Sequence, residues 1–141
     1  MGKNELLSLR KKEVWKIENN KIFEIEIPGL PPTVNHFYRT SRTGVRYKTA
    51  EGKAWQAGVV LLMRTANKNY QAYAGEVGLY IDLMSTDKRR WDVDNRIKAL
   101  QDCLASAGVI KNDTQVIELH ARRVHGDDEK TNVMIYKLAE K

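Results

Sequence analysis

The chain has 141 residues, 42% of them hydrophobic, and its 24 Lys and Arg outnumber its 18 Asp and Glu for a formal net charge of +6. This length suits one domain, and the apolar content excludes a wholly disordered chain. The basic excess favours a polyanionic partner, because a basic surface releases counterions from phosphates, although the same charge also promotes solubility. The single cysteine, Cys103, excludes an internal disulfide, and no apolar run reaches the length of a membrane span. We therefore expect a cytoplasmic protein that does not bind membranes.

The spacing of apolar residues predicts the secondary structure along the chain. An amphipathic helix can form over residues 3–16, and Phe23, Ile25 and Ile27 alternate with glutamates as in a half-buried strand. The remaining predicted elements are a loop or irregular hairpin over 35–48, a helix over 51–70, a strand over 76–84, a helix from Asp94 to about Ala107 closed by Gly108, and strands over 116–124 and 132–138 joined by a polar loop at 126–130.

This order of elements predicts an α+β fold, a single domain in which a mixed β-sheet packs against two main helices. The sequence shows no repeat, low-complexity tract or interdomain linker. We assign residues 21–141 to an endonuclease-like domain, for the reasons given below, and residues 1–20 to an N-terminal extension whose role is open.

The most informative polar residues lie between positions 88 and 116. Asp94 and Lys98 are one turn apart in the predicted helix, on the face opposite its apolar stripe. Asp92 precedes the helix, and Asp113 follows it across a short connection that returns the chain toward the sheet. We therefore expect Asp92 and Asp94 to enter one solvent-facing site, which Asp113 can also reach.

Three carboxylates beside a lysine suit phosphodiester hydrolysis. Mg²⁺ prefers oxygen ligands, and once bound it can activate water and neutralise developing charge. A nearby ammonium group can stabilise the transition state further. From the pattern alone, simpler explanations stay open: either aspartate at the helix start can be an N-cap, and Lys98 with Asp102 can be an ordinary surface ion pair.

Several separate segments resemble the RusA family of Holliday junction resolvases. The strongest match is W-D-V-D-N-R-I-K-A-L-Q-D-C-L, which is similar to the D-x-D-N-x-x-K helix of that family. The segment A-G-V-I-K-N-D-T-Q-V resembles the turn that follows, with Gly108, Asp113, Gln115 and Val116 in matching positions. Upstream, I-P-G-L-P-P-T-V-N-H-F-Y-R is similar to the Pro-Pro segment of the family, and K-T-A-E-G-K-A-W to the start of its first long helix. The matches are in order over about residues 24–138.

The resemblance implies a Mg²⁺-dependent endodeoxyribonuclease that resolves four-way (Holliday) DNA junctions by paired symmetric nicks, in DNA recombination and repair. It also implies a homodimer, and two symmetric cuts are consistent with two active sites related by a two-fold axis. By residue, it implies that Asp92, Asp94 and Asp113 hold the metal and that Lys98 is the active-site lysine, with Asn95 in a supporting polar role. No small-molecule cofactor is expected.

Two basic segments form the candidate DNA-binding surface, because Arg and Lys can bind phosphates while aromatic rings stack on unpaired bases. Its residues are Asn35, Tyr38, Arg39, Arg42, Arg46 and Lys48 in the first segment and Lys88, Arg89 and Arg90 in the second. A solvated loop is the alternative for the first segment. Next to the second, Trp91 stands where the family pattern leads us to expect a basic residue, and this difference can alter how DNA is seated.

Two other functions stay open. One is a nuclease of the same fold that prefers flaps or replication forks, and the other is a junction-binding module that no longer cuts. The presence together of Asp92, Asp94, Lys98 and Asp113 argues against the second, since loss of activity commonly shows as loss of a ligand. The three histidines have no zinc-ligand spacing with Cys103, so we do not expect a zinc site.

Overall fold

The structure, a computed structural model, describes residues 11–68, 71–88 and 91–138. Its elements are, in chain order, α1 (Lys11–Asn19), β1 (Lys21–Pro28), α2 (Val34–Phe37), β2 (Tyr38–Thr40), β3 (Arg46–Lys48), α3 (Ala50–Ala66), β4 (Val77–Ser85), the 3₁₀ turn η2 (Asp94–Arg96), α4 (Ile97–Ser106), the 3₁₀ turn η3 (Asp113–Gln115), β5 (Val116–His125) and β6 (Lys130–Lys137). Every strand and long helix predicted from β1 onward is present.

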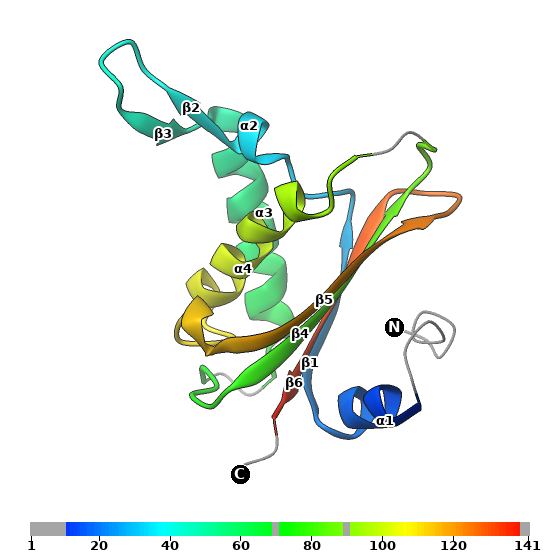
Figure 1. Cartoon of the computed structure of the whole chain (residues 1–141). Coiled ribbons are helices and arrows are strands. Elements are labelled where there is room, and N and C mark those ends of the chain that lie inside the picture. The colour runs from blue at the N-terminus through cyan, green and yellow to red at the C-terminus, as the bar shows by residue number, and fades with distance from the viewer. Residues whose placement is uncertain (1–10, 69–70, 89–90, 139–141) are drawn as a thin grey trace.

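Four strands form the main sheet, in the order β1-β6-β4-β5. β4 and β5 run parallel, whereas β6 is antiparallel to both β1 and β4, so the sheet is mixed. β2 and β3 pair as a separate antiparallel hairpin that extends beyond the helices (Figure 1). α3 and α4 lie on one side of the sheet and α1 lies on the other (Figure 1). The fold is therefore the predicted α+β domain, with a mixed sheet against two main helices.

The main hydrophobic core lies between the sheet and the two long helices. Its fully buried side chains include Leu79, Ile81 and Leu83 from β4, Val133 from β6, Met63 from α3, and Leu100, Cys103 and Leu104 from α4. Burying one such aliphatic side chain contributes about 1.5–3 kcal/mol. Cys103 is a core residue, as predicted, and burial raises the pKa of its thiol to about 12.

A smaller hydrophobic cluster forms on the opposite face of the sheet. Ile17 of α1 packs there with Tyr80, Met134 and Tyr136. Gly78 makes room for the Tyr136 ring, because a Cβ at this position would lie 2.0 Å from the ring. β4 is therefore buried along both of its faces, as expected for a central strand.

Two helix boundaries differ from the prediction. The second long helix was expected from Asp94, but residues 94–96 form a 3₁₀ turn and α4 begins at Ile97. Neither N-cap position makes a side-chain hydrogen bond, and 3₁₀ turns are frequent at the ends of α-helices. α3 ends at Ala66 rather than near residue 70, and the next residue, Asn67, is buried and donates to Gly108 O at 3.4 Å. Gly108 itself has a φ of 75° and closes α4 as predicted.

α1 spans Lys11–Asn19 and so ends beyond residue 16, where the predicted N-terminal helix was expected to end. Residues 3–10 of the predicted helix lie outside the described residues. The proposed boundary between extension and domain at residue 20 stays a prediction. In the part of the chain that the structure describes, no helix is long and apolar enough to cross a membrane.

Candidate active site

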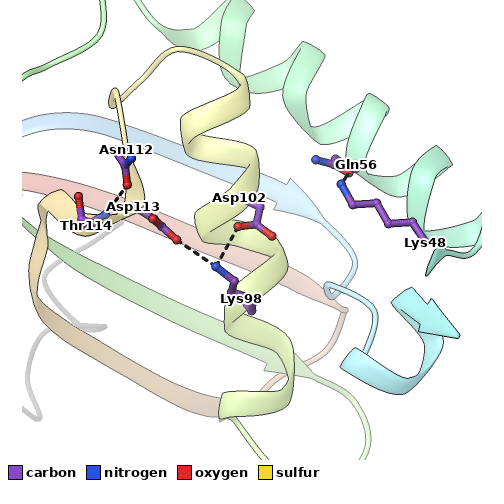
Figure 2. Close-up of polar contacts among 7 residues, drawn as sticks. All are labelled: Lys48, Gln56, Lys98, Asp102, Asn112, Asp113 and Thr114. Atoms are coloured by element: carbon purple, nitrogen blue, oxygen red, sulfur yellow. Dashed lines mark hydrogen bonds and ion pairs between the residues drawn. The ribbon is translucent and has the colours of Figure 1, made fainter. Parts of the chain in front are cut away.

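Lys98 lies between two carboxylates on the exposed side of α4 (Figure 2). Its Nζ donates a hydrogen bond to Asp113 Oδ2 at 2.9 Å and lies 3.2 Å from Asp102 Oδ1, one helical turn away. The hydrogen bonds to Asp113 and then to Asp102 raise the pKa of Lys98 above its ordinary value. The ammonium group is therefore charged at neutral pH and offsets the repulsion between the two acids. We call Lys98, Asp102 and Asp113 the Lys98 cluster.

Asp113 is held at this cluster by a capping box in η3. Asn112 Oδ1 accepts a backbone N–H within the turn at 2.9 Å, and Gln115 Oε1 accepts from Asn112 N at 2.9 Å. Gln115 also donates through Nε2 to Tyr73 O at 2.7 Å and to Gly75 O at 2.8 Å. These bonds tie the turn to the segment that leads into β4. This role of Gln115 was not predicted, although N-x-x-Q is capping-box spacing.

Asp92 and Asp94 are both exposed and lie in the connection between β4 and α4. Asp94 opens η2, four residues before Lys98. Among the described residues, no three Asp, Glu, His or Cys side chains lie close enough to hold a metal ion. The structure thus brings Asp113 to Lys98 but does not gather Asp92, Asp94 and Asp113 into one group. Their assignment to a metal site stays a prediction.

Trp91 links this connection to two arginines. Cζ of Arg96 lies 4.9 Å from the centroid of the Trp91 ring and Cζ of Arg123 lies 5.7 Å from it. Arg96 Nη1 donates to Pro31 O at 2.6 Å, and Arg123 Nη1 donates to Trp91 O at 3.0 Å. Because Trp91 directly precedes Asp92, these contacts fix the main chain immediately before Asp92 and Asp94. Neither arginine was predicted as a site residue, and no sequence spacing relates Arg123 to Trp91.

Lys48, at the end of β3, brings the basic hairpin to the carboxylates. Its Nζ donates to Gln56 Oε1 on α3 at 3.0 Å (Figure 2). Both residues line a pocket of about 280 Å³ that Asp102 and Asp113 also line. The base of the hairpin and the two acids of the Lys98 cluster therefore line one polar pocket. Neither Gln56 nor Asp102 was predicted as a site residue.

The other predicted DNA-binding residues of the first segment lie along the hairpin arm and the short helix before it. Asn35 is on α2, Tyr38 and Arg39 are on β2, Arg42 is in the turn, and Arg46 is on β3. Asn35 and the three arginines are exposed, and Tyr38 is half-buried with Cζ of Arg46 4.1 Å from its ring centroid. Of the second segment, Lys88 is exposed, whereas Arg89 and Arg90 lie outside the described residues.

Carboxylates, a charged lysine and a cationic arm in one region are typical of an enzyme that cleaves phosphodiesters. The family model described as "Endodeoxyribonuclease RusA" matches residues 28–136. The crossover junction endodeoxyribonuclease RusA of Aquifex aeolicus (strain VF5) is 31% identical over 97 residues, which is 69% of this chain and 76% of the relative. The protein of the same name in Escherichia coli (strain K12) is 34% identical and that of Enterobacteria phage 82 is 33% identical, each over 68% of this chain and 78% of the relative. This chain therefore belongs to the RusA family of endodeoxyribonucleases, which confirms the resemblance seen in the sequence.

Proposed function

We propose that this chain resolves four-way DNA junctions by paired symmetric nicks, as an endodeoxyribonuclease of DNA recombination and repair. The observation that carries the proposal is the position of Lys98, whose ammonium group lies between Asp102 and Asp113 within the segment that matches the family. The relatives described above bear the name crossover junction endodeoxyribonuclease, which supports a branched DNA substrate.

The proposed cofactor is Mg²⁺, and Asp92, Asp94 and Asp113 would hold it. Carboxylate oxygens are the donors that this hard cation prefers, and Asp92 and Asp94 are exposed to solvent. Their spacing forms no three-carboxylate group among the described residues, so the assignment rests on donor chemistry and on the family match. When bound, Mg²⁺ supplies an activated water and neutralises charge on the phosphate.

The protein's own side chains stabilise and position the reacting groups. In this proposal Lys98 stabilises the negative charge that develops on the scissile phosphate, because its ammonium group is charged and its contacts to Asp102 and Asp113 hold it in position. Gln115 keeps Asp113 in place through its hydrogen bonds to Asn112, Tyr73 and Gly75. Asn95, half-buried in η2, has a supporting polar role in this proposal.

Phosphates of the junction arms would bind the basic hairpin and the segment before Trp91. The residues assigned to this contact are Asn35, Tyr38, Arg39, Arg42, Arg46, Lys48, Lys88, Arg89 and Arg90. Contacts of this kind position the DNA without reading its sequence. We propose a homodimer as the active form, since two symmetric nicks require two sites related by a two-fold axis.

Asp94→Asn tests the site assignment while preserving the size of the side chain. We expect junction cutting to fall by at least ~100-fold, because even outer partners of metal ligands are worth 10–100-fold. Junction binding in EDTA should persist, since the change removes a negative charge near phosphates. Asp127→Asn, in the exposed turn between β5 and β6, removes the same charge and should cut at the wild-type rate. Wild-type cutting by Asp94→Asn would show that the assignment is wrong.

A further inference from the structure

A second pocket, of about 410 Å³, lies at the ends of β4 and β5. The two strands run parallel, and the last residue of each, Ser85 and His125, lines the pocket. Crevices outside the carboxyl ends of parallel strands are common ligand sites. The volume also lies within the usual range of ligand pockets, which is about 300–1,000 Å³.

The walls of this pocket combine one large aromatic ring with cationic side chains. Trp91 supplies the ring, and Lys88 and Arg123 supply two positive charges against the single acid Asp87. Aromatic faces stack on nucleic-acid bases with little regard to sequence, and Lys and Arg bind phosphates. A ring beside a net positive charge therefore fits a nucleotide better than a neutral or cationic ligand.

We propose that this pocket binds one unstacked nucleotide of the DNA junction, with its base against the Trp91 ring and its phosphate at Lys88 and Arg123. The inference rests on the proposed function, because it requires a branched substrate. Bases at a branch point have lost part of their stacking, and extruding a base costs least where stacking or pairing is already broken.

Part of the pocket wall is ordered by hydrogen bonds that do not involve DNA. Arg123 Nη1 donates to the main-chain oxygen of Trp91 at 3.0 Å, and Arg123 Cζ lies 5.7 Å from the centroid of the Trp91 ring, so the cation lies beside the ring. Ser85 Oγ accepts from Asp87 N at 3.0 Å at the end of β4. A wall that is ordered in advance loses less conformational entropy when it binds a nucleotide.

The pocket lies immediately before the aspartate pair, because Trp91 is the residue that precedes Asp92. A base held on Trp91 would fix which phosphate of that strand reaches Asp92 and Asp94. The pocket would therefore set the distance between the branch point and the cut. Trp91 stands where the family pattern predicts a basic residue, so this contact is a property of this chain rather than one carried over from the family.

The first experiment is an abasic scan of wild-type protein. Four-way junctions that each carry one abasic site near the branch point are titrated in EDTA, so that binding is measured without cutting. We expect one position, repeated by symmetry, at which loss of the base weakens binding by about 5- to 150-fold, the range of one base–aromatic stack. An abasic site well inside a duplex arm should have no comparable effect.

Three variants then test whether Trp91 is the partner of that base. Trp91→Leu should bind the intact junction more weakly and should show no further loss at the sensitive abasic position. Trp91→Phe should keep the sensitivity, because it keeps a ring. Trp15→Leu is the matched control, since Trp15 is exposed on α1 and should leave the scan unchanged.

A wild-type measurement covers the case in which Trp91→Leu does not fold. The junction carries 5-bromouracil at the sensitive position, and irradiation should cross-link it to Trp91, which peptide mass spectrometry identifies. A cross-link to another residue, a full abasic penalty in Trp91→Leu, or a scan with no sensitive position would overturn the inference.

If the junction were bound and cut but no abasic position weakened binding, only this inference would be wrong. If junction and linear duplex were bound equally, the proposed function would fall with it.

Discussion

Glu118, on β5, joins the N-terminal helix to the sheet through a charged hydrogen bond. Lys16 Nζ of α1 donates to its Oε1, and Tyr136 Oη donates to its Oε2 at 2.9 Å. The Lys16 bond, with a smaller contribution from Tyr136, outweighs desolvation and holds the pKa of Glu118 below its ordinary value. Since the folded state has the lower pKa, the contact adds stability above the pKa of the unfolded chain. That stability disappears as the pH falls through the folded value.

Glu118→Gln tests this linkage. We expect it to lower the free energy of unfolding at pH 7 by no more than about 1 kcal/mol, a small value because the carboxylate is 37% exposed. The difference from wild type should shrink as the pH falls below about 4.3, the ordinary glutamate pKa, and through the lower pKa of the folded state. Urea denaturation at each pH measures this difference in the free energy of unfolding, and Asp128→Asn in the exposed β5–β6 turn is the control. A difference that does not change with pH would show that ionisation of Glu118 is not linked to stability.

Some contacts between residues of the site can be predicted from their spacing in the sequence, and others cannot. Asp113 and Lys98 are separated by one helix and one short turn, so their approach was foreseeable from the sequence. The bond from Arg123 to Trp91 O joins residues that are 32 positions apart, and that from Gln115 to Tyr73 O joins residues 42 apart. Such contacts depend on how strands and loops pack, and the periodicity of one segment carries no information about that.

Among the elements, α1 places one fully buried side chain, Ile17, against the sheet, beside the Lys16–Glu118 bond. Ile17 is 1% exposed and packs with Tyr80, Met134 and Tyr136. Ile17→Ala should lower the free energy of unfolding by about 2–5 kcal/mol, the range for an aliphatic core side chain cut back to Ala. Trp15→Ala on the same helix removes a larger side chain that is 65% exposed, and should change the free energy of unfolding by less than about 0.5 kcal/mol. Equal effects in urea denaturation would show that α1 does not pack as described.

The β2–β3 hairpin should act on DNA through charge. Replacing Arg39, Arg42 and Arg46 by Ala should weaken junction binding and make its salt dependence shallower, by about 0.9 in the logarithmic slope for each phosphate that the variant no longer neutralises. The affinity is measured over a series of salt concentrations in EDTA. Replacing Lys11, Lys12 and Lys21 removes the same charge from α1 and the start of β1, and should change the slope much less. Equal slopes for both triple variants would mean that only net charge matters.

The elements themselves were largely predictable, because the alternating pattern of β1 and the apolar stripe of α4 each follow from burial of one face. The start of α4 at Ile97 could not be predicted, because no capping side chain marks it and a 3₁₀ turn of three residues directly precedes it. Strand order was not predictable either. β6 lies between β1 and β4, and this position follows from contacts between distant segments rather than from any one of them.

For the whole molecule, the same fold brings the basic arm and the acidic site together. β3 ends at Lys48, which lines one pocket with Asp102 and Asp113, while β4 and β5 end at the pocket beside Trp91. The sequence predicted the domain, its family and the Lys98–Asp113 neighbourhood. It did not predict either pocket, because each is assembled from several elements that only the fold makes adjacent.

Junction resolution by this protein can be tested with a labelled synthetic four-way junction, incubated with Mg²⁺ or with EDTA beside a flap and a linear duplex of the same sequence. We expect symmetric paired nicks near the branch point of the junction, in Mg²⁺ alone, with little cutting of the other two substrates. Equal cutting of the linear duplex would reduce the protein to a general nuclease, and preferred cutting of the flap would assign it a different branched substrate. Tight junction binding without nicks in Mg²⁺ would contradict the enzymatic claim itself.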